Sequence, residues 1–257
     1  MSGAPVIVSM NGSCLEVAFN RPLRRNALTH AMYEELVSAL ERSARDTAVR
    51  SVLFHGLGGH FTAGNDLSEF AESPPSDTQS PVFRFLRALV RHEKPLIAAV
   101  EGHAVGIGTT MLLHCDLSYA SPTAKFRLPF VDLALVPEAA SSLLLPRLVG
   151  MAKACEMLLL AEGFSGQEAR ELGIVSGTAA EGEVLEFARN KAMVLGAKAP
   201  ESVRLTKRLL RGRDADAIDA AMVEESSLFL ARLRSPEFSE AVSAFMAKRP
   251  PDFSRFE

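Results

Sequence analysis

Hydrophobic positions in the first 120 residues follow two periods, one typical of strands and one typical of helices. Short apolar runs predict strands at residues 5–10, 14–20, 51–56, 96–100 and 116–120. Thr29 is a candidate N-cap for a helix over residues 32–46, and a second helical pattern covers residues 82–92. This alternation of strands and helices predicts an α/β architecture in which strands pair in parallel.

The chain becomes predominantly helical after Pro137. Residues 151–162 form one helical pattern, and Ser165 with Glu168 provides the capping box of a shorter helix. From about residue 183 onward, nearly every segment has helical spacing. We therefore expect a body over residues 1–195 and a separate helical region over residues 196–257.

Composition narrows the classes of protein. Of the 257 residues, 47% are hydrophobic, which supplies a substantial core. The 28 Lys and Arg nearly balance the 31 Asp and Glu, and this balance argues against a general nucleic-acid binder. Because no apolar run has membrane-spanning length, and the first residues do not resemble a signal peptide, we expect no membrane partner. Three widely spaced cysteines form no disulfide framework, which favours a cytoplasmic location.

Two glycine-containing junctions follow predicted strands. They are HFTAGNDL at residues 60–67 and EGHAVGIGTTML at residues 101–112. Junctions of this kind leave backbone N–H groups without partners, and two such groups can stabilise a carbonyl oxygen that becomes negative. Spacing alone favours two ordinary tight turns over an oxyanion hole. The histidines have no spacing typical of a metal site, so we expect no metal.

Residues 133–146, LALVPEAASSLLLP, contain one charged residue, Glu138. A carboxylate buried without a partner is costly, so it acquires a raised pKa or pairs with another group. From these residues alone, Glu138 is either a proton-transferring group or a cap for the helix expected to begin near Ala140.

Several motifs occur in order along nearly the whole chain. They are RPLRRNAL (21–28), FTAGNDLSEF (61–70), KPLIAAVEGHAVGIG (94–108), CDLSYAS (115–121), ALVPEAASSLLLPRLVG (134–150) and GIVSG (173–177). Together they resemble the enoyl-CoA hydratase/isomerase, or crotonase, superfamily. The resemblance implies an α/β spiral of ββα turns with C-terminal helices that form a homotrimer or a hexamer. It also implies an acyl-CoA thioester substrate, with coenzyme A as part of that substrate and no separate cofactor.

The resemblance also assigns roles in the site. The two oxyanion-hole N–H groups would belong to Asn65, after Gly64, and to Ile107, after Gly106. Ala63, Asp66 and Leu67 would line the adenine and pantetheine pocket. The same comparison assigns CoA phosphates to Arg24 and Arg25, and a CoA contact near a subunit boundary to Lys248.

The sequence departs from the hydratase pattern at two positions. Family hydratases carry two glutamates where this chain has Thr110 and Phe130. Threonine is a poor base at neutral pH, and phenylalanine transfers no proton. The resemblance therefore covers substrate binding at these positions but not the hydratase catalytic pair.

Glu138 matches a glutamate of the Δ3,Δ2-enoyl-CoA isomerase branch, which the motif PEAASSLLLP resembles most. Isomerisation needs one carboxylate that accepts a proton and returns it. We therefore predict an enoyl-CoA isomerase with Glu138, Asn65 and Ile107 as catalytic groups. Two alternatives stay open: a hydratase or other crotonase-type lyase that combines Glu138 with Asp132 or a histidine, and a non-catalytic acyl-CoA-binding protein.

Overall fold

A six-stranded sheet lies at the centre of the molecule. The computed structural model describes residues 3–256, and its sheet has the order β1-β2-β3-β4-β6-β9. The strands are β1 Val6–Asn11, β2 Cys14–Phe19, β3 Ser51–Gly56, β4 Leu96–Val100, β6 Leu117–Ala120 and β9 Gly177–Thr178. β1 and β2 form an antiparallel hairpin, and the other neighbours pair in parallel. The predicted α/β class and the predicted strands are confirmed.

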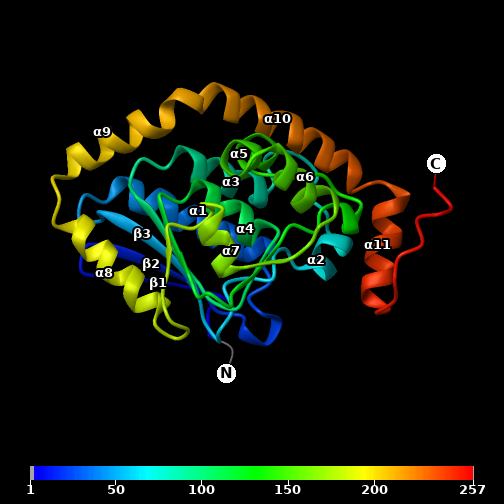
Figure 1. Ribbon diagram of the computed structural model, residues 1–257, viewed down its shortest axis with the longest axis horizontal. Helices are drawn as coiled ribbons and strands as arrows, with labels where there is room; N and C mark the ends of the chain where they lie inside the picture. The colour runs from blue at the N-terminus through cyan, green and yellow to red at the C-terminus, as the bar shows by residue number, and fades with distance from the viewer. Residues whose placement is uncertain (1–2, 257) are drawn as a thin grey trace.

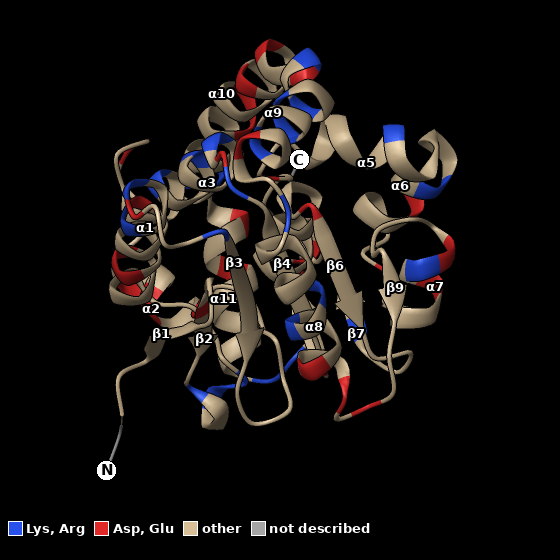
Figure 2. Cartoon of the chain, turned by 90° about the vertical axis from the view of Figure 1, so that its left-hand side faces the viewer, with Lys and Arg blue, Asp and Glu red and all other residues tan. Residues whose placement is uncertain are grey.

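Helices cover both faces of this sheet. On one face lie α1 (His30–Arg45) and α3 (Pro81–Arg91), which pack against each other. Thr29 caps α1 as predicted, because its side chain accepts the N–H of Met32 at 3.3 Å. Helix α8 (Val184–Gly196) packs on the opposite face against β3, β4 and β6, in front of the sheet in Figure 2. The sheet therefore separates two hydrophobic clusters, the larger on the α1 side.

A second, three-stranded sheet has the order β5-β7-β8. Its strands are β5 His103–Val105, β7 Lys125–Arg127 and β8 Phe164–Ser165. We expected only a glycine-rich turn and a helix before His114, whereas the turn contains β5, and the helix is α4 (Ile107–Thr110) followed by the 3₁₀ turn η2 (Met111–His114). Strands of two or three residues are too short to produce a detectable alternation of apolar and polar positions.

Shorter elements connect these layers. They are η1 (Pro22–Arg24), α2 (Leu67–Glu72), η3 (Val131–Leu133), α5 (Ser141–Val149), α6 (Met151–Leu159), α7 (Gly166–Glu171) and η4 (Gly212–Asp214). The predicted capping box is confirmed at α7, where Ser165 accepts the N–H of Glu168 and the Glu168 carboxylate accepts the N–H of Ser165.

Three helices form the C-terminal region: α9 (Pro200–Arg211), α10 (Ala215–Arg232) and α11 (Pro236–Met246). Figure 1 shows α9 and α10 as an arc above the body, with α11 descending at one side. The descent brings α11 against α2 and η3. The helical region is confirmed, whereas the division at residue 195 stays a prediction. None of the helices within residues 3–256 combines the length and apolar character needed to cross a bilayer.

Candidate active site

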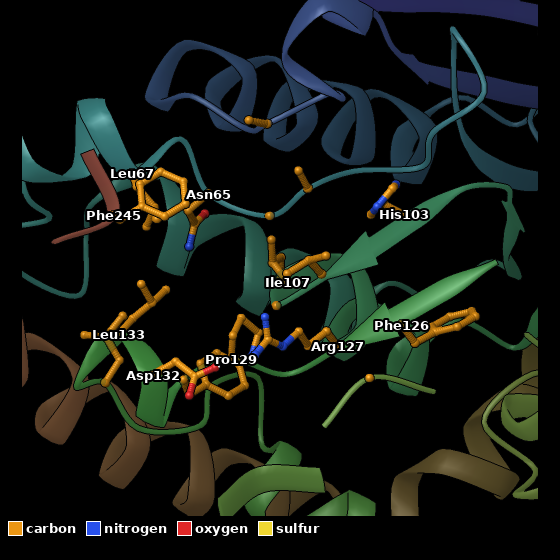
Figure 3. Close-up of a pocket in the computed structure, with 18 of the residues that line it drawn as sticks. Asn65, Leu67, His103, Ile107, Phe126, Arg127, Pro129, Asp132, Leu133 and Phe245 are labelled. Carbon is orange, nitrogen blue, oxygen red and sulfur yellow. Dashed lines mark hydrogen bonds and ion pairs between the residues drawn. The ribbon is translucent and has the colours of Figure 1, made fainter. Parts of the chain in front are cut away.

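A cavity of about 1340 Å³ is lined by residues of the three-stranded sheet, by the loops around it and by the C-terminal helices α10 and α11. Figure 3 shows Asn65, Leu67 and Phe245 on one wall, with Pro129, Asp132 and Leu133 across from them. The remaining walls include Ile107, Phe130 and Glu138. Segments from most of the chain length therefore meet in one pocket, and the predicted catalytic residues Asn65, Ile107 and Glu138 all line it.

Two backbone segments run side by side just before the N-terminus of α4. Thr62 and Ala104 form a parallel bridge, in which the Thr62 N–H donates to the His103 carbonyl and the Val105 N–H donates to Thr62. Asn65 and Ile107 each lie three residues beyond this bridge, so the bridge brings their N–H groups to the same region. Within residues 3–256, neither N–H donates to a protein acceptor. Two unpaired donors beside a cavity are the arrangement needed to hold an oxyanion.

Two glycines permit this close approach. Gly64 has φ +88°, and a Cβ at this position would lie 2.8 Å from the carbonyl oxygen of Val105. Gly106 precedes α4 with φ +54° and ψ −117°, a conformation that side-chain-bearing residues rarely adopt. Both positions therefore favour glycine, which agrees with their predicted place in the site.

The side chain of Asn65 is oriented from α1. The hydroxyl of Tyr33 donates to its Oδ1. Tyr33 is fully buried and packs against Phe85, with ring centroids 5.6 Å apart. Burial, with smaller contributions from Glu138 and Glu69, raises the pKa of Tyr33 well above its ordinary value, so it is a hydrogen-bond donor at neutral pH. This bond leaves the Asn65 amide nitrogen directed toward the cavity, as Figure 3 shows.

Glu138 is a buried carboxyl whose Oε1 has no hydrogen-bond partner among residues 3–256. Its residue exposure is 3%. Burial raises the pKa of Glu138 to about 8, and the negative charge of Glu225 adds to the shift. The neighbouring Thr110 hydroxyl opposes the shift, but its Oγ1 also lacks a partner of normal hydrogen-bond geometry. A carboxyl with this pKa can accept and donate a proton near neutral pH.

The turn after Glu138 has an unusual backbone. Ala139 (φ +60°) and Ala140 (φ +54°) are both left-handed although neither is glycine. Nε2–H of His114 donates to the Ala139 carbonyl at 2.7 Å. Burial lowers the pKa of His114 to about 4, so this histidine is neutral at pH 7. The cap interpretation of Glu138 receives no support, because Ala140 is the N-cap of α5 and no side chain caps that helix from this position.

Thr110 and Phe130, which stand where family hydratases carry glutamates, lie in different environments. Phe130 lines the cavity with an apolar ring. Thr110 is fully buried and lies behind the cavity wall rather than on it. Neither residue provides a carboxyl group to the site.

All but two of the predicted binding residues line the cavity. Arg24, Arg25, Ala63, Asp66 and Leu67 line it. The Asp66 carboxylate also accepts a hydrogen bond from Arg21 at 3.0 Å, which anchors the loop. Thr110 is one exception. The other is Lys248, whose predicted role at a subunit contact stays a prediction, whereas its neighbour Arg249 lines the cavity.

Several residues of the site have no recognisable pattern in the sequence. Tyr33 and His114 lie in segments with helical spacing, and this spacing does not distinguish them from other residues of a helix. The apolar wall contributed by α10 and α11 contains Phe229, Phe238 and Phe245. Amphipathic spacing could mark these aromatic residues as buried, but it could not show that they face a cavity rather than a closed core. Within residues 3–256, no group of three His, Cys, Asp or Glu side chains is placed to hold a metal ion.

Comparisons with known proteins agree with this arrangement. The enoyl-CoA hydratase/isomerase family model matches residues 9–255. The 2,3-dehydroadipyl-CoA hydratase of Escherichia coli (strain K12) is 35% identical over 252 residues, which cover 96% of this chain and 98% of that protein. Enoyl-CoA delta isomerase 2 of Rattus norvegicus is 33% identical over 251 residues and 95% of this chain, which spans 64% of that protein's length.

A solved structure gives the same result at the level of the fold. The structure of Pseudomonas aeruginosa OdaA has a TM-score of 0.93 and 45% identity, with coverage of 95% of this chain and 99% of that chain. The fold of this chain, C-terminal helices included, is therefore similar to that of a solved structure. The predicted crotonase-type fold is confirmed, and the chain belongs to the enoyl-CoA hydratase/isomerase family.

Proposed function

We propose that this protein is a Δ3,Δ2-enoyl-CoA isomerase, which moves a double bond from C3 to C2 of an enoyl-CoA thioester. The observation that carries the proposal is the Glu138 carboxyl, which lines the cavity, is buried and has one oxygen without a hydrogen-bond partner among the described residues 3–256. Asn65 and Ile107 also line the cavity, and their backbone N–H groups donate to no acceptor in the described part of the chain. One proton carrier and one oxyanion hole are sufficient for this reaction.

The reaction proceeds in two proton transfers. Ionised Glu138 removes a proton from C2 of the 3-enoyl thioester, and the electron pair moves into the carbonyl to give a dienolate. The N–H groups of Asn65 and Ile107 stabilise the negative thioester oxygen. Protonated Glu138 then donates to C4, and the carbonyl re-forms as the double bond settles between C2 and C3. The pKa of about 8 keeps both protonation states of Glu138 accessible at neutral pH.

A hydratase would require a second group to hold and activate water. Thr110 and Phe130 do not supply it, because one is buried behind the wall and the other is apolar. Asp132 lines the cavity, but its carboxylate already forms an ion pair with the Arg127 guanidinium at 2.8 Å. Of the two relatives described above, one is named a hydratase and the other an isomerase, so their names favour neither activity.

The rest of the cavity suits an acyl-CoA. Arg24 and Arg25 provide positive charge at the cavity for phosphate groups, whereas Arg249 is paired with Glu240 at 2.6 Å. The aromatic wall from α10 and α11 provides an apolar surface for the acyl chain. Coenzyme A would be part of the substrate, and we propose no separate cofactor. The expected cytoplasmic location stays a prediction.

We also propose a homotrimer or a dimer of trimers. The supporting observation is the set of exposed large apolar side chains on the C-terminal helices, since apolar surface of this kind is usually covered in an assembly. These residues are Leu209, Leu210, Val223 and Leu228, which are between 50% and 77% exposed in the single chain.

The decisive experiment incubates the pure protein with 3-enoyl-CoA and 2-enoyl-CoA in separate reactions and identifies the products. The proposal predicts 2-enoyl-CoA from the first substrate and little or no 3-hydroxyacyl-CoA from the second. Rapid hydration of 2-enoyl-CoA would favour the hydratase alternative and overturn the proposal. Binding of both thioesters without turnover would instead identify a non-catalytic acyl-CoA-binding protein.

A further inference from the structure

A second buried carboxylate, Glu225 of α10, lies behind the turn that carries Glu138. Its residue exposure is 6%. Oε2 accepts the N–H of Ala140 at 2.6 Å, while Oε1 accepts the N–H of Ser142 at 2.9 Å and its hydroxyl at 2.5 Å. Both oxygens are therefore occupied by donors from the segment that directly follows Glu138.

These bonds hold a strained backbone. A left-handed conformation is unfavourable at a residue other than glycine, and Ala139 and Ala140 adopt it consecutively. Such a turn persists only when neighbouring groups fix it. His114 fixes the Ala139 carbonyl, and Glu225 fixes the Ala140 N–H. The position of Glu138 is thus set from η2 on one side and from α10 on the other.

The bonding pattern also defines the charge of Glu225. Two of its three hydrogen-bond donors are backbone N–H groups. An N–H group cannot accept a hydrogen bond from a protonated carboxyl, so the ionised carboxylate satisfies this site best. Burial raises the pKa of Glu225, and the bonds from Ser142 and Ala140 act in the opposite direction. By contrast, Oε1 of Glu138 has no hydrogen-bond partner within the described chain, so of the two carboxyls it is Glu138 that retains a proton more readily.

We propose that Glu225 is the positioning residue of the site: it anchors the turn of residues 138–142 to α10 and places a fixed negative charge behind Glu138. The inference rests on the proposed isomerase function, because it assigns Glu225 to the proton carrier of that reaction. It also gives α10 a role in catalysis, through a residue that does not line the cavity.

Other groups that act on Glu138 cannot take this role. Tyr33 of α1 is the second titratable neighbour, but its raised pKa keeps it neutral. His114 is neutral at pH 7 and bonds the backbone rather than the carboxyl. Thr110 of α4 has no titratable group in this range. Glu225 is therefore the neighbour whose charge bears on the Glu138 proton.

The test compares Glu225→Gln with Glu225→Asp. Isomerase kcat/KM should rise with pH as Glu138 ionises, so its acid limb marks the Glu138 pKa. Glu225→Gln removes the negative charge and should move this limb to lower pH by about one unit. Glu225→Asp keeps the charge but shortens the side chain, so kcat should fall by roughly tenfold while the limb stays in place.

Glu224→Gln is the matched control, because it removes the same charge from the adjacent exposed position of α10. It should leave kcat and the acid limb unchanged. If the acid limb of kcat/KM in Glu225→Gln lies at the wild-type pH, the charge role of Glu225 is overturned. The charge role is also overturned if Glu224→Gln moves the acid limb as far as Glu225→Gln does. If Glu225→Gln does not fold, a Glu225→Asp protein with wild-type kcat overturns the anchoring role.

An infrared titration separates this inference from the proposed function. The Glu138 carboxyl signal, identified by its loss in Glu138→Gln, should titrate at lower pH in Glu225→Gln even if the wild type isomerises no thioester. That result would support the inference and leave the function to be reassigned. An isomerase whose Glu138 titration is the same with and without the Glu225 charge would contradict the inference alone.

Discussion

Glu16 and Glu138 are both buried carboxyls, with exposures of 5% and 3%, yet their surroundings differ completely. Glu16 lies on β2 and faces α8, where Arg189 donates to both of its oxygens at 2.8 and 2.9 Å. Asn11 adds a third hydrogen bond at 2.7 Å. Glu138 lies in the turn before α5, and its Oε1 has no partner within residues 3–256.

The two pKa values move in opposite directions as a result. The hydrogen bonds from Arg189 lower the pKa of Glu16 despite its burial. At Glu138 burial is the largest influence, and it raises the pKa to about 8. Burial alone therefore does not distinguish a structural carboxylate from a proton carrier. The distinguishing feature is whether a cation and hydrogen-bond donors satisfy the charge.

The largest expected effect is the loss of isomerisation in Glu138→Gln. The substitution preserves shape and removes only the proton-transferring group. General acid–base catalysis contributes roughly 10²–10⁴-fold, and the upper end is expected because one group performs both transfers. Turnover of 3-enoyl-CoA measures the change, and acyl-CoA affinity should remain within a few-fold. A variant that keeps more than about a tenth of wild-type turnover contradicts the assignment.

Thermal unfolding of Glu138→Gln provides a second readout with a defined sign. Because the folded pKa of Glu138 lies above the ordinary value of 4.5, ionisation is easier in the unfolded chain. Wild-type stability should therefore fall as the pH rises from about 4.5 to about 8. Glu138→Gln should be more stable than wild type at high pH and show no such advantage at pH 4.

Removing one oxyanion donor should have the next largest effect. Ile107 is the first residue of α4, where proline is tolerated because the N–H has no helical partner. Ile107→Pro should lower turnover by roughly 10²–10³-fold. Ile107→Gly keeps the N–H and is the control. A folded Ile107→Pro protein with unchanged turnover would show that this N–H does not contact the thioester oxygen.

Glu16→Gln should affect stability rather than catalysis. It leaves Arg189 without its buried partner, and the expected cost is about 2 kcal/mol at neutral pH, moderated because Arg189 can still reach water. The lowered pKa of Glu16 means that its contribution exists above about pH 4.5 and disappears as the pH falls. Denaturant unfolding at pH 7 and pH 3 measures this difference. An isomerase defect without a stability loss would reverse the roles of the two carboxyls.

Tyr33→Phe should have the smallest effect. It removes the hydrogen bond to Asn65 Oδ1 and preserves the ring that packs on Phe85. We expect kcat/KM to decrease by roughly three- to tenfold, the value of one hydrogen bond, with the melting temperature changed little. Steady-state kinetics measures the effect. If kcat/KM were unaltered, orientation of the Asn65 side chain would have no part in the reaction.

The sequence was sufficient to locate the main strands, the Thr29 cap, the capping box at Ser165 and the C-terminal helices, because each depends on local spacing. Family resemblance then located Asn65, Ile107 and Glu138. The short strands β5, β7 and β8 escaped prediction because they are stabilised by pairing across distant segments rather than by local pattern.

The role of Glu225 could not be predicted either, because it also depends on contacts between distant segments. In α10 its neighbours include Glu224, and one of two adjacent glutamates gives no sign of burial. Its three hydrogen-bond donors lie more than 80 positions earlier in the chain. The left-handed conformation of Ala139 and Ala140 is equally invisible, since alanine usually favours helix.

A difference infrared titration of both carboxyls tests the central contrast most directly. Subtracting the Glu138→Gln and Glu16→Gln spectra from wild type isolates each carboxyl signal in the same protein. We expect Glu138 to be protonated at pH 7 and to ionise near pH 8, whereas Glu16 remains ionised to below its ordinary pKa of 4.5. A Glu138 carboxyl already ionised at pH 6 would contradict the claim that an unpartnered buried carboxyl is the proton carrier of this site.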